Sequence, residues 1–280
     1  MKKTLSRLFA VVATLCLLTA CGNKAEDPFV AIGDEDLSQT VICPRQVLLQ
    51  ELDRDVDGLI SCDTQFFVQR PAALGYRGAD YWRFYIHFDT VYKAGDYCYA
   101  VEGRTRFRDT VRCFAGEVVM DSLRLIWTLD SLDDYTYRSM LYLNIDAGGY
   151  LYGHYIFRED STVAGSGVLQ GKVTYSVVRQ RGKLQYDTEG IDYADGFDNN
   201  QYEGTWTSYV SVRSEKCNWG DSRIPDSQEL DIGAGYFCPA DEHLDKGWRL
   251  LRELDELNYG DSKEDSLIAL YQVDADWWRR

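Results

Sequence analysis

The middle of the chain alternates between apolar and polar residues, the pattern of β-strands with one buried face. Between residues 140 and 209 this alternation recurs in short runs separated by turn residues, which predicts an antiparallel meander. The predicted strands are 141–145, 150–157, 173–178, 184–188 and 206–209, with turns at 146–149, near Gly165 and Gly167, and at 181–182. The pattern therefore predicts a curved sheet, a barrel or a sandwich as the scaffold.

The same period of two appears before the meander. Trp82, Phe84, Ile86 and Phe88 alternate with polar residues, and residues 123–129 repeat the pattern. Residues 97–101 and 106–114 are expected to pair as a hairpin. Residues 41–115 would then form an N-terminal, cysteine-containing part of the domain, and residues 116–212 its meander.

Helical patterns flank the strands. Residues 44–52 predict a short helix, because proline suits its first turn. Leu244, Trp248, Leu251, Leu254 and Leu257 recur at helical spacing and predict an amphipathic helix that covers an open end or a face of the sheet. Residues 267–271 fit a second short helix or a strand. The expected fold class is mainly β (a β-rich α+β fold), with residues 213–280 as its loop and helical part.

The chain ends in two tryptophans and two arginines, Trp277 to Arg280. Packing of this end onto the domain is favoured over partner binding, since indole rings stabilise most when they are buried.

Residues 1–20 have the order of a bacterial signal peptide. Lys2, Lys3 and Arg7 precede an apolar run that is too short to span a membrane as a mature helix. The run ends in Leu18, Thr19, Ala20 and Cys21, which resembles the lipobox of bacterial lipoproteins. The resemblance implies cleavage before Cys21 and lipidation of its thiol with a diacylglycerol and palmitate-type acyl chains.

Residues 21–40 are acidic and predict a tether between the lipid and a domain at 41–280. Gly22 and Asn23 follow the lipidated cysteine, so an aspartate signal for inner-membrane retention is missing. Lys24 to Asp27 is similar to the short acidic sequence that directs some lipoproteins to the cell surface. By resemblance, the expected location is the outer membrane of a Gram-negative bacterium.

The chain is strongly acidic, with 30 basic and 45 acidic residues and a formal net charge of −15. Loss of residues 1–20, which hold three basic and no acidic residues, changes this to −18. Such a domain repels phosphate backbones and anionic headgroups, so nucleic acid is excluded as a partner and the lipid must supply the membrane attachment.

Eight cysteines become six once Cys16 leaves with the signal peptide and Cys21 is lipidated. In an oxidising envelope six cysteines predict three disulfides. Sequence proximity suggests Cys43–Cys62, Cys98–Cys113 and Cys217–Cys238, although fifteen pairings are possible.

One acidic turn is similar to a calcium-binding loop. Its candidate ligands are Asp53, Asp55, Asp57, Ser61 and Asp63. Aspartates at positions 1, 3 and 5 and glycine at position 6 match the EF-hand pattern, but Thr64 replaces the bidentate glutamate at position 12. An ordinary acidic turn explains the residues as well. Calcium is thus a candidate ion, and no cofactor is required.

Residues 187–203 interleave carboxylates with aromatic rings. The binding-surface candidates are Tyr186, Asp187, Glu189, Asp192, Tyr193, Asp195, Asp198 and Tyr202. A carboxylate pair beside aromatic rings could hydrolyse a glycan. A solvated acidic loop is the simpler interpretation in a chain of this charge.

Two glycine–aromatic signatures occur in the meander: Gly153 with Tyr155, and Gly204 with Trp206. They resemble the strands of lipocalin- or avidin-like envelope lipoproteins. The resemblance covers about seventy residues and implies a curved sheet rather than a particular ligand.

Common catalytic sequence motifs for a serine elbow, a zinc protease and a nucleotide loop do not occur. The expected function is therefore a lipid-anchored envelope binding or accessory protein without catalytic activity, whose partner is another envelope protein or a glycan. The alternatives are a carbohydrate-active hydrolase using a carboxylate pair in residues 187–203 and a calcium-stabilised structural component of an envelope complex.

Overall fold

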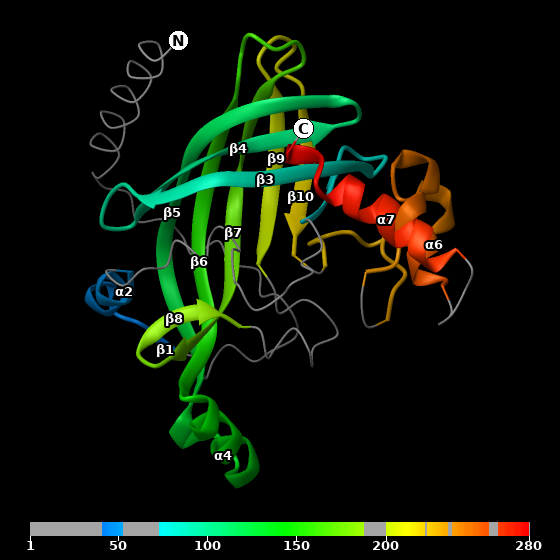
Figure 1. The fold of residues 1–280 in the computed structure, drawn as a ribbon. Helices are drawn as coiled ribbons and strands as arrows, with labels where there is room; N and C mark the ends of the chain where they lie inside the picture. The colour runs from blue at the N-terminus through cyan, green and yellow to red at the C-terminus, as the bar shows by residue number, and fades with distance from the viewer. Residues whose placement is uncertain are drawn as a thin grey trace. The chain divides into compact units, whose positions relative to one another are not determined.

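The structure is a computed structural model of the 280-residue chain and describes residues 41–52, 73–187, 200–221, 223–234, 237–257 and 263–279. These residues belong to one compact unit, Gln39–Arg280. Figure 1 shows its curved strands and its helices.

The strands of this part form one ten-stranded sheet in which neighbouring strands run antiparallel (Figure 1). The sheet closes on itself in the order β5-β4-β3-β2-β10-β9-β7-β6, because β6 also pairs with β5; β1 and β8 add to β5 and β7 from outside this ring. The strands are β1 (Val41–Ile42), β2 (Leu74–Arg77), β3 (Trp82–Lys93), β4 (Cys98–Phe107), β5 (Thr110–Thr128), β6 (Ile145–Glu159), β7 (Gly167–Gln180), β8 (Lys183–Tyr186), β9 (Gln201–Ser208) and β10 (Ser214–Gly220). The mainly β prediction is confirmed, in the form of a barrel.

The helices lie before, between and after the strands. They are α2 (Arg45–Leu52), η2 (Leu129–Ser131), α4 (Asp134–Leu143), η3 (Asp241–Lys246), α6 (Arg249–Asp255), α7 (Glu264–Ala275) and η4 (Trp277–Arg279). The predicted helix at 44–52 is confirmed as α2. The predicted C-terminal helix is divided into η3 and α6 at Gly247, whose φ of 98° is left-handed.

The inward positions of the strands form the main core. Because side chains alternate between the two faces of a strand, Phe84 and Ile86 of β3 face inward together, as do Tyr155 and Phe157 of β6. Aromatic rings from different strands meet inside the ring: Tyr202 stacks on Trp219 with centroids 4.7 Å apart, and Phe157 is 4.9 Å from Phe114. The alternation predicted from the sequence thus specifies the inner face of the ring.

A second core cluster lies between the outward side of β2 and the C-terminal helices. It contains Tyr76, Phe237 and Trp248, all buried. The indole Nε1 of Trp248 donates to the backbone oxygen of Tyr81 at 2.7 Å. The C-terminal part therefore covers a face of the sheet, one of the two positions expected for it.

The predicted strand 141–145 is wrong, because most of it is the end of helix α4. The carboxylate of Asp133 accepts hydrogen bonds from the backbone N–H groups of Tyr135 and Thr136, which begins the helix. Asn144, with φ 59°, ends it in the left-handed conformation. Strand β6 begins only at the next residue.

The predicted turn at 146–149 is also wrong, since these residues lie inside β6. A Cβ atom at Gly148 would come 2.5 Å from the ring of Trp127, and one at Gly149 would come 2.1 Å from the backbone oxygen of Arg124. Glycine is needed here for close packing of β6 on β5 rather than for a turn.

The predicted hairpin has the wrong turn, and its disulfide does not form. Strand β4 continues to Phe107, and the turn falls at Arg108, which has a φ of 55°. Cys98 is paired with Val119 and Cys113 with Arg104, so the two cysteines lie six residues apart along the ladder. At ~3.4 Å per residue they are about 20 Å apart, far beyond the roughly 7 Å limit for disulfide-bonded Cα atoms.

The predicted disulfide Cys217–Cys238 does not form either. Cys217 is fully buried on the inward face of β10, whereas Cys238 lies in the loop before η3, with its Sγ 3.2 Å from a carboxylate oxygen of Asp255. The sheet wall separates the two thiols. The third predicted pair involves Cys62, which lies outside the described residues.

Candidate functional site

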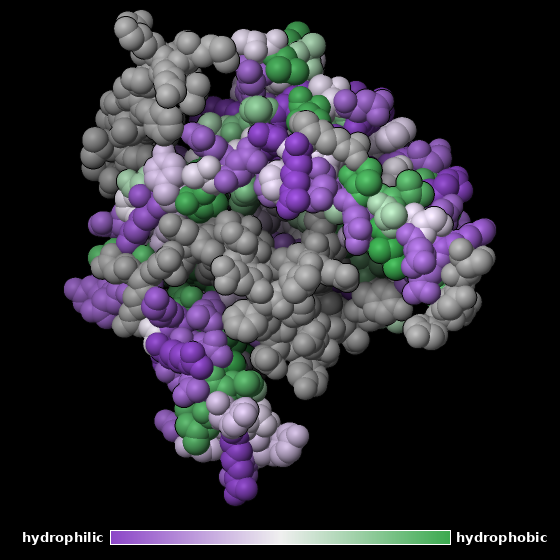
Figure 2. All heavy atoms as spheres, in the orientation of Figure 1, coloured by the Kyte–Doolittle hydropathy of each residue, from purple (hydrophilic) through white to green (hydrophobic). Residues whose placement is uncertain are grey.

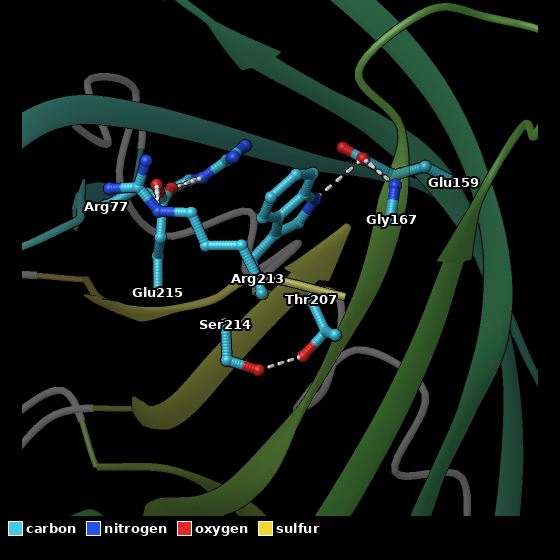
Figure 3. A network of polar contacts seen from close by, with 8 residues as sticks. Arg77, Glu159, Gly167, Thr207, Arg213, Ser214 and Glu215 are labelled. Atoms are coloured by element: carbon cyan, nitrogen blue, oxygen red, sulfur yellow. Dashed lines mark hydrogen bonds and ion pairs between the residues drawn. The ribbon is translucent and has the colours of Figure 1, made fainter. Parts of the chain in front are cut away.

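A buried carboxylate organises one end of the ring (Figure 3). Glu159 is the last residue of β6 and is 3% exposed. Its oxygens accept hydrogen bonds from Thr105 Oγ1 (2.5 Å), the backbone N–H of Gly167 (2.9 Å) and Trp206 Nε1 (2.9 Å). The donors come from β4, β7 and β9, so one side chain joins four strands.

An ion pair lies beside this carboxylate. Arg77 Nε donates to Glu215 Oε2 at 2.7 Å, and Arg213 Nε is 3.2 Å from the other oxygen of Glu215 (Figure 3). The Arg77 guanidinium lies 3.2 Å from the centroid of the Trp206 ring. Burial lowers the pKa of Arg77, and its bond to Glu215 opposes that effect. Trp206 thus contacts a cation with its face and a carboxylate with its edge.

Most polar atoms of this network have a hydrogen-bond or ion-pair partner within it. Both Glu159 oxygens receive donors, and both Glu215 oxygens face guanidinium groups. Arg112, also buried, donates to the backbone oxygens of Thr110 and Ala164 and so fastens the β6–β7 loop to β5. We assign this network the structural role of holding the strand ends together.

These residues were not predicted from the sequence, although a signal for them exists. Glu159 continues the inward positions Tyr155 and Phe157, and Arg112 precedes inward Phe114 by two residues. A charged residue in the apolar register of a strand must be buried with a partner. The side-chain partners Thr105 and Trp206 are 54 and 47 residues from Glu159 and could not be identified from the sequence.

In contrast to the buried Glu159 network, helix α4 has a fixed backbone and exposed side chains. It joins β5 to β6, and none of its residues is buried. In addition to its two capping residues, two hydrogen bonds fix its C-terminal end. Gln180 Nε2 donates to the backbone oxygen of Leu143 at 2.9 Å, and the backbone N–H of Arg181 donates to the backbone oxygen of Asn144 at 2.9 Å. The helix extends away from the sheet and forms a protrusion in the space-filling view (Figure 1, Figure 2).

One face of α4 carries two tyrosines and an arginine. Tyr135, Arg138 and Tyr142 are separated by three and four residues, so they lie on the same side of the helix. Tyr135 is 82% exposed and Tyr142 is 86% exposed. We call these three residues the α4 stripe. Tyrosine and arginine are the residues most enriched at energetically important interface positions, together with tryptophan.

The predicted binding surface at 186–202 is only partly described. Tyr186 and Tyr202 are each 3% exposed and belong to the inner core, where the Tyr202 hydroxyl lies 2.8 Å from that of Tyr175. The backbone N–H of Asp187 donates to the oxygen of Ser176. The two tyrosines therefore serve the core instead of an exposed surface. The remaining candidates lie outside the described residues: Glu189, Asp192, Tyr193, Asp195 and Asp198.

The predicted calcium ligands and the lipidation site also lie outside the described residues: Cys21, Asp53, Asp55, Asp57, Ser61 and Asp63. Within the described ranges no group of three or more metal-ligating side chains comes together. None of the helices in that part of the chain has the length and apolar character needed to cross a bilayer.

The chain was compared with protein-family models, characterised proteins and solved structures. It matches none of them.

Proposed function

We propose that this is a lipid-anchored binding or accessory protein of a bacterial cell envelope, without catalytic activity, that contacts its partner through the α4 stripe. The lipobox sequence at Leu18 to Cys21 supports the anchor, and the missing aspartate after Cys21 supports the location in the outer membrane. The observation that carries the binding role is a helix that is fixed at both ends and carries two tyrosines more than 80% exposed.

Helix α4 is preorganised for binding. A short helix in water is marginal unless it is capped or packed, and α4 is capped by Asp133 and Asn144 and tied to the turn after β7. The backbone that carries the exposed rings is therefore held in place before any partner arrives, which lowers the entropy cost of binding. Tyrosine also provides large contact area with few rotatable bonds. The stripe suits an envelope protein or a glycan.

The test uses the full, lipidated chain recovered from detergent-extracted membranes. Replacing the stripe by Tyr135→Ser, Arg138→Ser and Tyr142→Ser should reduce the amount of co-purified partner at least tenfold, because interface residues of this type each contribute about 1–4 kcal/mol. The matched control replaces the exposed residues Val210 and Ile232, 89% and 59% exposed, with serine. Equal partner recovery from both variants would sink the proposal. Separately, Cys21→Ala should release the protein from membranes.

A further inference from the structure

The last residues of the chain lie on the outward face of β3 and β4 (Figure 1). The carboxylate of Asp274 accepts hydrogen bonds from the Tyr85 hydroxyl (2.8 Å) and from Arg106 Nη2 (2.5 Å). Trp277 is 3% exposed and meets the Tyr85 ring edge-on, with centroids 6.0 Å apart. The prediction that this end packs on the domain is confirmed.

Trp278, the next residue, also makes specific contacts with this face. The Trp278 ring stacks on the His87 imidazole, with centroids 3.7 Å apart and planes 8° from parallel. Its backbone oxygen accepts a hydrogen bond from Arg104. The outward face of β3 and β4 thus holds one carboxylate, two indoles and a backbone carbonyl within six residues of chain.

Three arginines, Arg83, Arg104 and Arg106, lie on this face beside the carboxylate of Asp89, although the whole chain is acidic. Arg104 is paired with Asp89 at 3.2 Å, and Arg106 is paired with Asp274. Arg83 is 5% exposed and lies over the rings of Tyr85 (4.6 Å) and Trp248 (4.5 Å), while its buried Nη1 has no hydrogen-bond partner among the described residues. One nitrogen of this buried guanidinium therefore lacks a hydrogen bond among the described residues, which is costly in a partly desolvated site.

We propose that the outward face of β3 and β4 is a recognition surface for an acidic, tryptophan-containing peptide of a partner protein, and that the chain's own residues 271–279 occupy it in the absence of that peptide. The bound segment shows what the surface accepts: a carboxylate at Arg106 and an indole at His87. The surface complements one further carboxylate, at Arg83. Tyr271 lies one turn before Asp274 on α7, and Arg83 lies over the Tyr85 ring whose hydroxyl bonds Asp274. Burial raises the pKa of the Tyr271 hydroxyl, and the charge of Arg83 opposes the rise. A partner peptide with an acidic residue in place of Tyr271 would supply that carboxylate.

A free peptide must compete with the chain's own end, which is covalently attached to the surface it binds. A tethered segment binds at an effective concentration in the millimolar range, so a free peptide of the same sequence binds the intact chain only weakly. A peptide that also neutralises Arg83 gains an additional charged contact and can displace the tethered segment. The surface consists of different residues from the α4 stripe, so this inference is independent of the proposed function.

The experiment measures fluorescence anisotropy of labelled peptides titrated with the full chain. One peptide has the sequence of residues 271–279, and a second carries Tyr271→Glu. Weakening the tethered segment by Trp278→Ala in the chain should raise the affinity for the first peptide at least tenfold. The second peptide should bind more tightly than the first, and Arg83→Gln should remove this advantage.

Controls separate recognition from loss of folding. Arg106→Gln added to Trp278→Ala should lower peptide affinity at least tenfold. The matched control is Arg108→Gln, which should leave the affinity unchanged because the Arg108 guanidinium lies over the Trp82 ring and not under the chain end. A peptide carrying Asp274→Asn should bind at least tenfold more weakly and requires no change to the protein. Absence of binding by the Trp278→Ala chain, or binding that survives loss of both Arg106 and the peptide's Asp274, would overturn the proposal.

Discussion

Glu159 and Trp206 are joined by a 2.9 Å hydrogen bond that crosses from β6 to β9, two strands that do not pair with each other. The intervening strand β7 contributes the N–H of Gly167 to the same carboxylate. Thr105 reaches it from β4, beyond β5. Glu159 therefore links β6 to β4 and β9, two strands with which β6 does not pair, at the end where the β4–β5, β6–β7 and β9–β10 connections meet.

Replacing Glu159 with alanine should destabilise the fold strongly. The change leaves three buried donors without an acceptor, at a cost of about 3 kcal/mol or more. Urea unfolding followed by circular dichroism measures the loss. Glu203→Ala, on the exposed side of β9, is the matched control and should change stability by less than about 0.5 kcal/mol. Equal effects of the two substitutions would refute the central position of Glu159.

Gly171 should tolerate no side chain. A Cβ atom there would lie 1.9 Å from the backbone oxygen of Glu203 on β9, so Gly171→Ala must push two paired strands apart. The expected loss is about 1–3 kcal/mol or more. At Gly95 the nearest atom would be 3.6 Å away, and Gly95→Ala should leave the melting temperature nearly unchanged. A tolerated Gly171→Ala would contradict the close approach of β7 to β9.

The sequence predicted the sheet well because its main signal is local. The inward registers of Phe84, Ile86, Tyr155 and Phe157 follow directly from a period of two. Turn positions were less certain wherever glycine occurs. Gly148 and Gly149 resemble a turn in sequence, yet they lie in β6 against Trp127 and the backbone of Arg124, contacts that depend on strand register and not on the local sequence.

The candidate sites were harder to predict for the same reason. The run Leu141 to Ile145 alternates like a strand, and only the bonds from Asp133 and the left-handed Asn144 specify a helix. Exposure of Tyr142 depends on how that helix leaves the sheet. The side-chain partners of Glu159 and the docking of Trp278 on His87 join residues 47 or more positions apart, which no local pattern encodes.

The cysteines give a direct test of the corrected disulfide predictions. Cys113 is exposed and should react with iodoacetamide in the folded, unreduced protein. Cys217 should react only after unfolding, because it is fully buried and burial raises the pKa of its thiol well above the ordinary value. Peptide mass spectrometry locates the label. Recovery of a Cys98–Cys113 disulfide peptide from native protein would contradict the register of β4 and β5.

His154 should make a small contribution to stability that depends on pH. Its Nδ1 lies 2.9 Å from Asp121, and this hydrogen bond raises the pKa of His154 above 6.5, while burial opposes the rise. A raised folded-state pKa stabilises the fold at low pH, and the stabilisation is lost as pH rises through that pKa. Because the side chain is 55% exposed, the effect should be only a few tenths of a kcal/mol.

Proton NMR titration of the His154 ring gives the pKa itself. Asp121→Asn should bring it back toward 6.5 and remove the pH-dependent increment in stability. An unchanged titration in that variant would show that the carboxylate is not the cause.

The most direct test of the binding role is site-specific photo-crosslinking in living cells. A photoreactive phenylalanine analogue replaces Tyr142 on the α4 stripe, and, as a control, Val210, which is at least as exposed. The account predicts a discrete crosslinked species from position 142 that is absent at position 210 and lost when Tyr135 and Arg138 are changed to serine. No adduct at position 142, or the same adducts from both positions, would contradict the assignment of α4 as the contact surface.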